Sequence, residues 1–177
     1  SAGFDGMRVP SSASMPEGQF LSWQPGTLYS DKTDTIPWLL EPGSDLVIQV
    51  HMNPSGKPEP FQCSVGLYFS DEPPVATPYK IKLTSLAIDI PPNEQKFEVK
   101  DEFVLPGDVE VTRVLPHAHY LCRRMEGYAI LPDGSKKWLL LIKNWDFNWQ
   151  GDYQYQNSVF LPKGTKITMN YTFDNTT

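Results

Sequence analysis

Two histidines separated by a single residue, His117 and His119, are the side chains in this sequence best suited to binding a metal ion. In a β-strand the side chains alternate between the two faces, so residues i and i+2 point the same way, with Cα atoms about 6–7 Å apart. Two imidazole nitrogens on one face can therefore converge on one metal, and Ala118 keeps the opposite face small. Imidazole suits copper, zinc, iron and nickel alike, and two ligands are too few for a tight site. The simpler alternative is that both histidines are polar residues at the end of a strand.

The third and last histidine, His51, follows an apolar run over residues 46–50. Three methionines, Met52, Met125 and Met169, are candidates for an additional soft ligand. Each of them would have to be brought to the histidine pair by the fold. Packing in the core or on the surface is the favoured role for all three.

The two cysteines, Cys63 and Cys122, leave their redox state open. One disulfide between them is possible, but a sequence does not establish the geometry that a disulfide needs. Cys122 lies three residues after His119 and could serve as a soft metal ligand. A disulfide or a buried thiol is the favoured interpretation.

Alternating apolar residues between frequent turns predict an all-β fold. The chain has 17 prolines and 12 glycines, which interrupt helices and mark turns. Residues 131–135, Leu-Pro-Asp-Gly-Ser, predict a hairpin turn. Strands that recur every 8–12 residues are typical of an antiparallel β-sandwich, here of a jelly-roll-like kind. The predicted strands are 45–52, 63–70, 96–105, 109–115, 125–131, 137–142, 153–161 and 166–173, with extended structure over 79–90 and loops over 1–37.

The net charge and the length of the apolar runs argue against two broad classes of function. A chain of 177 residues is long enough for a sizeable core. Its net charge of −6 and the absence of a basic cluster argue against binding to nucleic acid. No apolar run approaches the roughly 20 residues that span a bilayer, so no membrane span is expected in this segment.

Several short segments follow one another in a recognisable order. Residues 46–53 read Leu-Val-Ile-Gln-Val-His-Met-Asn, 63–67 read Cys-Ser-Val-Gly-Leu, and 90–94 read Ile-Pro-Pro-Asn-Glu. His-Ala-His follows at 117–119, and 145–175 contains Asp-Phe-Asn-Trp-Gln and Leu-Pro-Lys-Gly-Thr. In this order the segments resemble the copper type II, ascorbate-dependent monooxygenases, the family of peptidylglycine α-hydroxylating monooxygenase and dopamine β-monooxygenase. The family motifs are Leu-Gln-Val-His-Tyr, Cys-Ser-Gly-Val, Ile-Pro-Pro-Gly-Glu and His-x-His, and the last segment is similar to bacterial members.

The resemblance covers residues 40–177 and implies two β-sandwich domains, each with a copper ion. It implies that one copper passes an electron while the other binds dioxygen and directs hydrogen abstraction from a substrate C–H bond, with ascorbate as reductant. By this resemblance His51 is a ligand of the electron-transfer copper, and His117 and His119 are the catalytic ligands of the oxygen-binding copper. The implied partners are a small-molecule or peptide substrate, dioxygen and an ascorbate-like reductant. The implied location is extracytoplasmic, either periplasmic or secreted.

Two departures from the family qualify this hypothesis. The family supplies an adjacent His-His pair upstream of the position of His51, and no histidine precedes His51 here. The family also has a methionine ligand in a segment beyond the point where this sequence stops. We therefore expect 1–88 to be the C-terminal part of a first domain and 89–177 to be a truncated second domain, with a missing flanking domain as a partner. The segment alone is expected to be inactive, and the alternative function is a non-catalytic copper-binding or interaction domain.

Overall fold

The structure is a computed structural model that describes residues 23, 37–74, 76, 78–86 and 88–176. Apart from Trp23, these residues divide into two compact units, 37–79 and 80–176. Of the predicted loop region 1–37, only residues 23 and 37 are among the described residues. The described part of the chain contains no helix that is long and apolar enough to cross a membrane. The assignment of 1–88 and 89–177 to two family domains stays a prediction.

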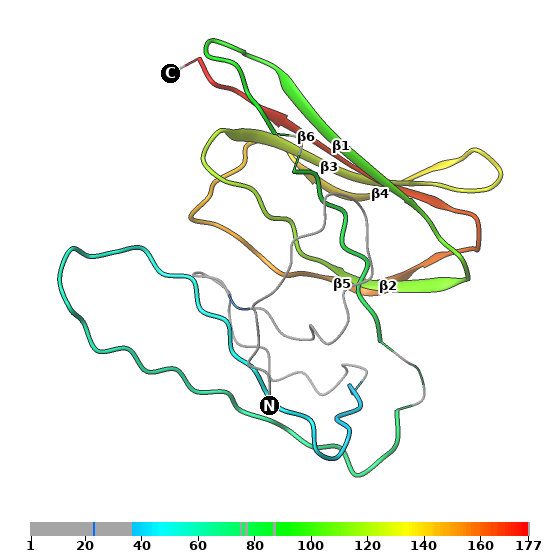
Figure 1. The fold of residues 1–177 in the computed structure, drawn as a ribbon. Helices are drawn as coiled ribbons and strands as arrows, with labels where there is room; N and C mark the ends of the chain where they lie inside the picture. Colours follow the sequence, from blue (N-terminus) through cyan, green and yellow to red (C-terminus); the bar gives the residue numbers. More distant parts are fainter. Residues whose placement is uncertain (1–22, 24–36, 75, 77, 87, 177) are drawn as a thin grey trace. The chain divides into compact units, whose positions relative to one another are not determined.

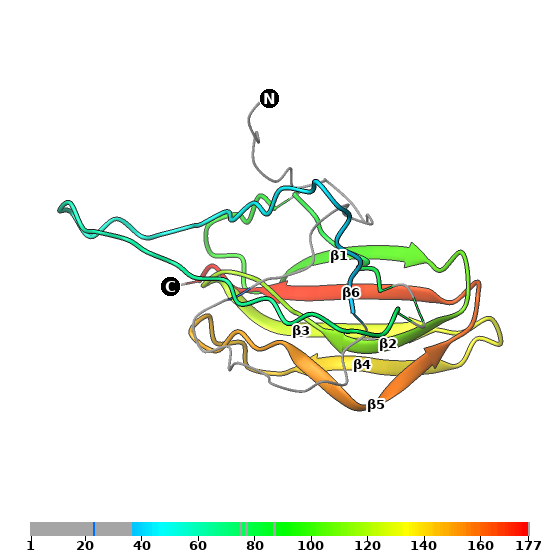
Figure 2. The ribbon, with the colours of Figure 1, turned by 90° about the horizontal axis from the view of Figure 1, so that it is seen from below.

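The larger sheet has four antiparallel strands in the order β1 (Phe97–Val104), β6 (Lys166–Phe173), β3 (Cys122–Ile130) and β4 (Lys136–Ile142) (Figures 1 and 2). Strand β6 is central and pairs along its whole length with β1 on one side and β3 on the other. Its alternate residues face one side of the sheet, as a period of two requires. Three of these residues are buried and apolar: Ile167, Tyr171 and Phe173.

The smaller sheet pairs β2 (Val109–Val114) with β5 (Tyr153–Leu161), also antiparallel (Figure 1). Its apolar residues and those of the larger sheet pack into one cluster, which shows that the two sheets face each other. The buried members are Leu105, Ala129, Leu161 and Ile167, with Phe103, Val109, Val111 and Val159 among the partly buried neighbours. The predicted all-β antiparallel sandwich is therefore confirmed.

The six strands of this sandwich follow the predicted apolar patterns closely. Strand β3 begins at Cys122, three residues before the predicted start, because its ladder with β6 continues to the pair Cys122–Phe173. The hairpin between β3 and β4 forms at the predicted turn, where the Leu131 N–H donates to the Ser135 carbonyl at 2.9 Å. Gly134 has φ of 84° there, in the left-handed region that glycine adopts without steric cost.

The first part of the described chain differs from the strand pattern that its sequence predicts. No strand forms over 45–52 or 63–70, and over 79–90 the described residues contain only an isolated bridge at Lys82. The apolar patterns are present, but in the described structure these runs have no neighbouring strand to satisfy the main-chain N–H and C=O groups. The strands predicted for 45–52 and 63–70 are therefore wrong for this structure.

Candidate metal centre

The segment that carries His117 and His119 continues from strand β2 but leaves its ladder. Strand β2 ends at Val114, and residues 115–119 have no regular secondary structure. The side chains of this segment nevertheless alternate between two sides: Pro116 and Ala118 are buried, whereas both histidines are exposed. The chain thus presents the two imidazoles on one side of the segment, as the i, i+2 spacing predicts.

The two imidazole rings lie close enough to share one metal ion. Their centroids are 5.2 Å apart and the ring planes are inclined at 83°. Two imidazoles bound to one metal through nitrogens about 2.0–2.1 Å from it have centroids roughly 5 Å apart in tetrahedral coordination. The donor set and its spacing therefore fit a metal that accepts nitrogen ligands.

A loop between β4 and β5 contacts both imidazoles. The Nδ1 atom of His117 is 2.6 Å from Oε1 of the buried Gln150. The ring of Phe147 meets the ring of His119 edge-on with centroids 5.7 Å apart, and it also packs against the ring of Tyr120 at 4.3 Å. The loop thus supplies a polar partner to one histidine and an aromatic wall to the other.

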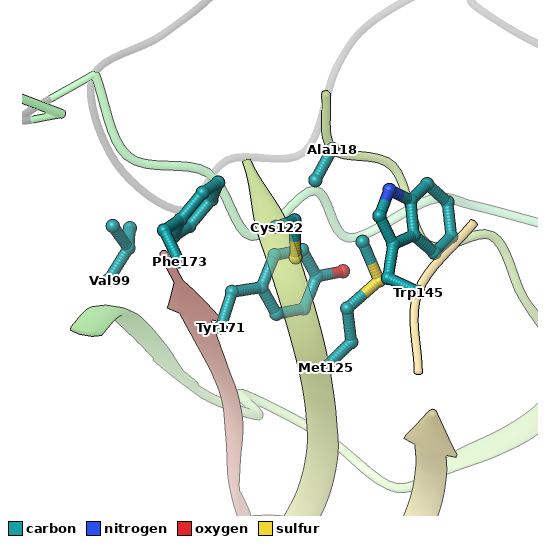
Figure 3. Packing of buried hydrophobic residues seen from close by; sticks show 7 residues of the cluster. All are labelled: Val99, Ala118, Cys122, Met125, Trp145, Tyr171 and Phe173. Carbon is teal, nitrogen blue, oxygen red and sulfur yellow. The ribbon is translucent and has the colours of Figure 1, made fainter. Parts of the chain in front are cut away.

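The opposite side of the histidine segment is anchored in the core of the sandwich. Ala118 packs in a buried cluster with Met125, Tyr171 and Trp145 (Figure 3). The Tyr171 hydroxyl lies beside the main chain of His117, and burial raises the pKa of this phenol. Because Tyr171 lies on the central strand β6, its packing with Ala118 places the histidine segment against the most extensively paired part of the sheet.

The structure does not give His51 a comparable setting. His51 belongs to the unit of residues 37–79 and is exposed. Its Nε2 atom is 2.6 Å from Nε2 of Gln49, two residues away. An amide nitrogen only donates, so the His51 Nε2 lone pair accepts this bond, and a metal binding there would have to displace it.

Met125, Met169 and Cys122 have the packing roles that the sequence favours for them, whereas Met52 is exposed. Met125 is fully buried on the side of the segment that Ala118 faces, away from the exposed imidazoles. Met169 packs at the edge of the same cluster, and Met52 is exposed in the other unit. Cys122 is also fully buried, and burial raises the pKa of its thiol to about 11.

Neither thiol forms a disulfide: Cys63 is free and exposed, and Cys122 is free and buried. Among the described residues, no three His, Cys, Asp or Glu side chains come together in a group that could hold one metal. The two imidazoles are thus the nitrogen donors that the structure brings together.

No family model, curated protein or solved structure matches this chain.

Three residues around the pair had no assigned role in the sequence analysis: Gln150, Phe147 and Tyr171. Gln150 lies 33 positions beyond His117, and no spacing rule connects them. The sequence does carry one local signal for this loop, since Asp146 is a residue typical of turns. In the structure its carboxylate accepts the Asn148 N–H at 2.8 Å. This turn predicts a folded loop, but it does not reveal where that loop packs.

Proposed function

We propose that the chain is a copper-dependent, ascorbate-requiring monooxygenase-like protein that hydroxylates a C–H bond with dioxygen. One observation carries the proposal: two exposed imidazoles, His117 and His119, share one side of the chain with ring centroids 5.2 Å apart. Imidazole alone does not choose among copper, zinc, iron and nickel. The choice of copper rests on the order of sequence segments that resemble the copper monooxygenase family.

A copper ion held by this pair would supply dioxygen binding and one-electron chemistry. The residues of the chain have simpler tasks. His117 and His119 offer ring nitrogens, and Gln150 restrains one of the two rings. Tyr120 and Phe147 form an aromatic surface beside His119, where an apolar part of a small molecule or peptide could lie. An ascorbate-like reductant and an extracytoplasmic location remain part of the proposal by the same resemblance.

The first test measures copper affinity of the intact chain and of single alanine variants at the two histidines. Replacing His117 or His119 should weaken copper binding by more than about 100-fold, since it removes one of two direct ligands, whereas changes outside the ligand shell cost 10–100-fold. The matched control is His51→Ala, which should leave the affinity of this site within about twofold. Unchanged copper binding by the double variant H117A/H119A would refute the assignment.

The second candidate function is a non-catalytic copper-binding or interaction domain. It is favoured by the small donor set, because the described residues gather two imidazoles and no third His, Cys, Asp or Glu. The two candidates differ in product formation with copper, ascorbate, oxygen and candidate substrates. We expect little coupled hydroxylation by these 177 residues alone. Hydroxylated product in one-to-one proportion to oxygen consumed would exclude the non-catalytic candidate.

A further inference from the structure

Gln150 is a buried polar side chain in contact with the proposed metal ligand His117. Only 7% of its surface is exposed, and both ends of its amide are engaged. Its Nε2 atom donates to the Phe147 carbonyl at 2.9 Å, and its Oε1 atom is 2.6 Å from Nδ1 of His117. A side chain held at both ends in this way has a defined orientation.

The direction of these two hydrogen bonds fixes the location of a proton on His117. A main-chain carbonyl oxygen only accepts, so the Gln150 amide must turn its NH₂ group toward Phe147. Its oxygen then faces His117 and carries no hydrogen, so the Nδ1 atom of His117 must be the donor. In a neutral imidazole the other nitrogen, Nε2, then holds the lone pair.

The loop that carries Gln150 is itself well anchored. The Trp145 N–H donates to the Arg123 carbonyl at 2.8 Å, which fastens the start of the loop to strand β3. Trp149 donates its N–H to the Asp146 carbonyl at 3.0 Å and closes a turn just before Gln150. The orientation of Gln150 is therefore set by the fold before any metal binds.

We propose that Gln150 is a positioning residue that holds His117 as the Nδ1–H tautomer and so directs its Nε2 lone pair to a metal. The inference rests on the proposed function, because that function supplies the metal that the His117 Nε2 atom would bind. Metal-bound histidines commonly donate their second ring N–H to an oxygen acceptor, which fixes the ring and strengthens the ligand. Here a glutamine carbonyl oxygen is that acceptor.

The direct test is a nitrogen-15 nuclear magnetic resonance measurement of histidine tautomers in the metal-free intact chain. It is made at about pH 8.5, well above the usual histidine pKa of about 6.5. His117 should be protonated at Nδ1 in the native chain. In Gln150→Leu the same ring should shift toward the Nε2–H form that usually predominates in unrestrained histidine. Gln150→Glu loses the donor to the Phe147 carbonyl but keeps an oxygen acceptor for His117, so it should retain the native tautomer.

Copper affinity provides the second readout. Gln150→Leu should weaken copper binding by about 10–100-fold, as loss of an outer-shell partner does elsewhere. Gln150→Glu should stay much closer to the native chain. The matched control is Gln156→Leu, because Gln156 is an exposed glutamine on the nearby strand β5 and its replacement should leave affinity unchanged.

The outcomes separate this inference from the proposed function. An Nε2–H tautomer of His117 in the native chain would overturn the role of Gln150, and this result needs no variant to fold. Copper binding that depends on both histidines but is unchanged in Gln150→Leu would overturn it as well while leaving the proposed function standing. An Nδ1–H tautomer that is lost in Gln150→Leu supports the inference, even if copper proves to be the wrong metal.

Discussion

Two regions of this chain carry similar apolar patterns but differ in structure. Residues 45–52 and 63–70 alternate or cluster apolar side chains much as β6 does, yet only β6 belongs to a sheet. Ile48 is 49% exposed, whereas Ile167 in β6 is 8% exposed. The difference shows that an apolar pattern is not sufficient to form a strand. A strand also needs neighbours that pair with its main chain and cover its apolar face.

The same difference separates the two candidate metal sites. His117 and His119 extend from a strand of the sandwich, and core contacts of Ala118 and Tyr171 hold their main chain. His51 follows an apolar run that is not part of any sheet. Ligand positions are defined more sharply where the supporting segment is tied to a packed core.

The largest expected effect is on the stability of the sandwich, and it would confirm or break the contrast between the two regions. Met125→Ala should lower the free energy of unfolding by about 2–5 kcal/mol, because a fully buried side chain is replaced by a cavity. Ile48→Ala, at a half-exposed position, should cost less than about 1 kcal/mol. Chemical denaturation of both variants provides the measurement. Equal losses would mean that residues 37–79 pack into a core that this structure does not show.

The second prediction is that ionisation of the Cys122 thiol at alkaline pH lowers the free energy of unfolding by about 2–3 kcal/mol. The Cys122 thiol has a pKa of about 11 in the folded chain, raised by burial from 9.0. A raised acid pKa stabilises the fold fully below pH 9, because the neutral form is preferred in the folded state. This contribution falls as pH rises from about 9 to about 11, where the unfolded thiol ionises more readily than the folded one.

The measurement compares unfolding free energies of the native chain and two variants across this pH range. Cys122→Ala should lose about 2–3 kcal/mol less stability than the native chain between pH 8 and about 12, since it lacks the titrating group. Cys63→Ala is the control in the other unit, where the thiol is exposed, and its pH dependence should match the native chain. Parallel curves for all three proteins would show that Cys122 is not buried in the folded state.

The smallest effect tests how far the order of the core extends into the histidine segment. Tyr171→Phe removes the hydroxyl that lies beside the main chain of His117. It should lower the free energy of unfolding by about 1 kcal/mol, the usual net value of one hydrogen bond. Tyr120→Phe, at an exposed position near the same segment, should cost less than about 0.5 kcal/mol. If the two variants are equally stable, the contact between Tyr171 and the segment contributes little.

The sequence by itself determined much of the sandwich. Strand positions from 97 to 173 followed from alternating apolar residues and from turns such as 131–135, because these signals are local. The common side of His117 and His119 also followed from local geometry, since an i, i+2 pair shares one side of an extended chain. The packing role favoured for Met125 agrees with its burial.

The tertiary structure decided the rest. Whether 45–52 becomes a strand depends on a partner elsewhere in the chain, and an apolar pattern does not state whether that partner is present. The contacts of His117 with Gln150 and Tyr171 join residues 33 and 54 positions apart, and only the packing of a loop and a central strand brings them together. Local sequence sets the direction in which a side chain points, whereas its partners depend on long-range packing between sheets.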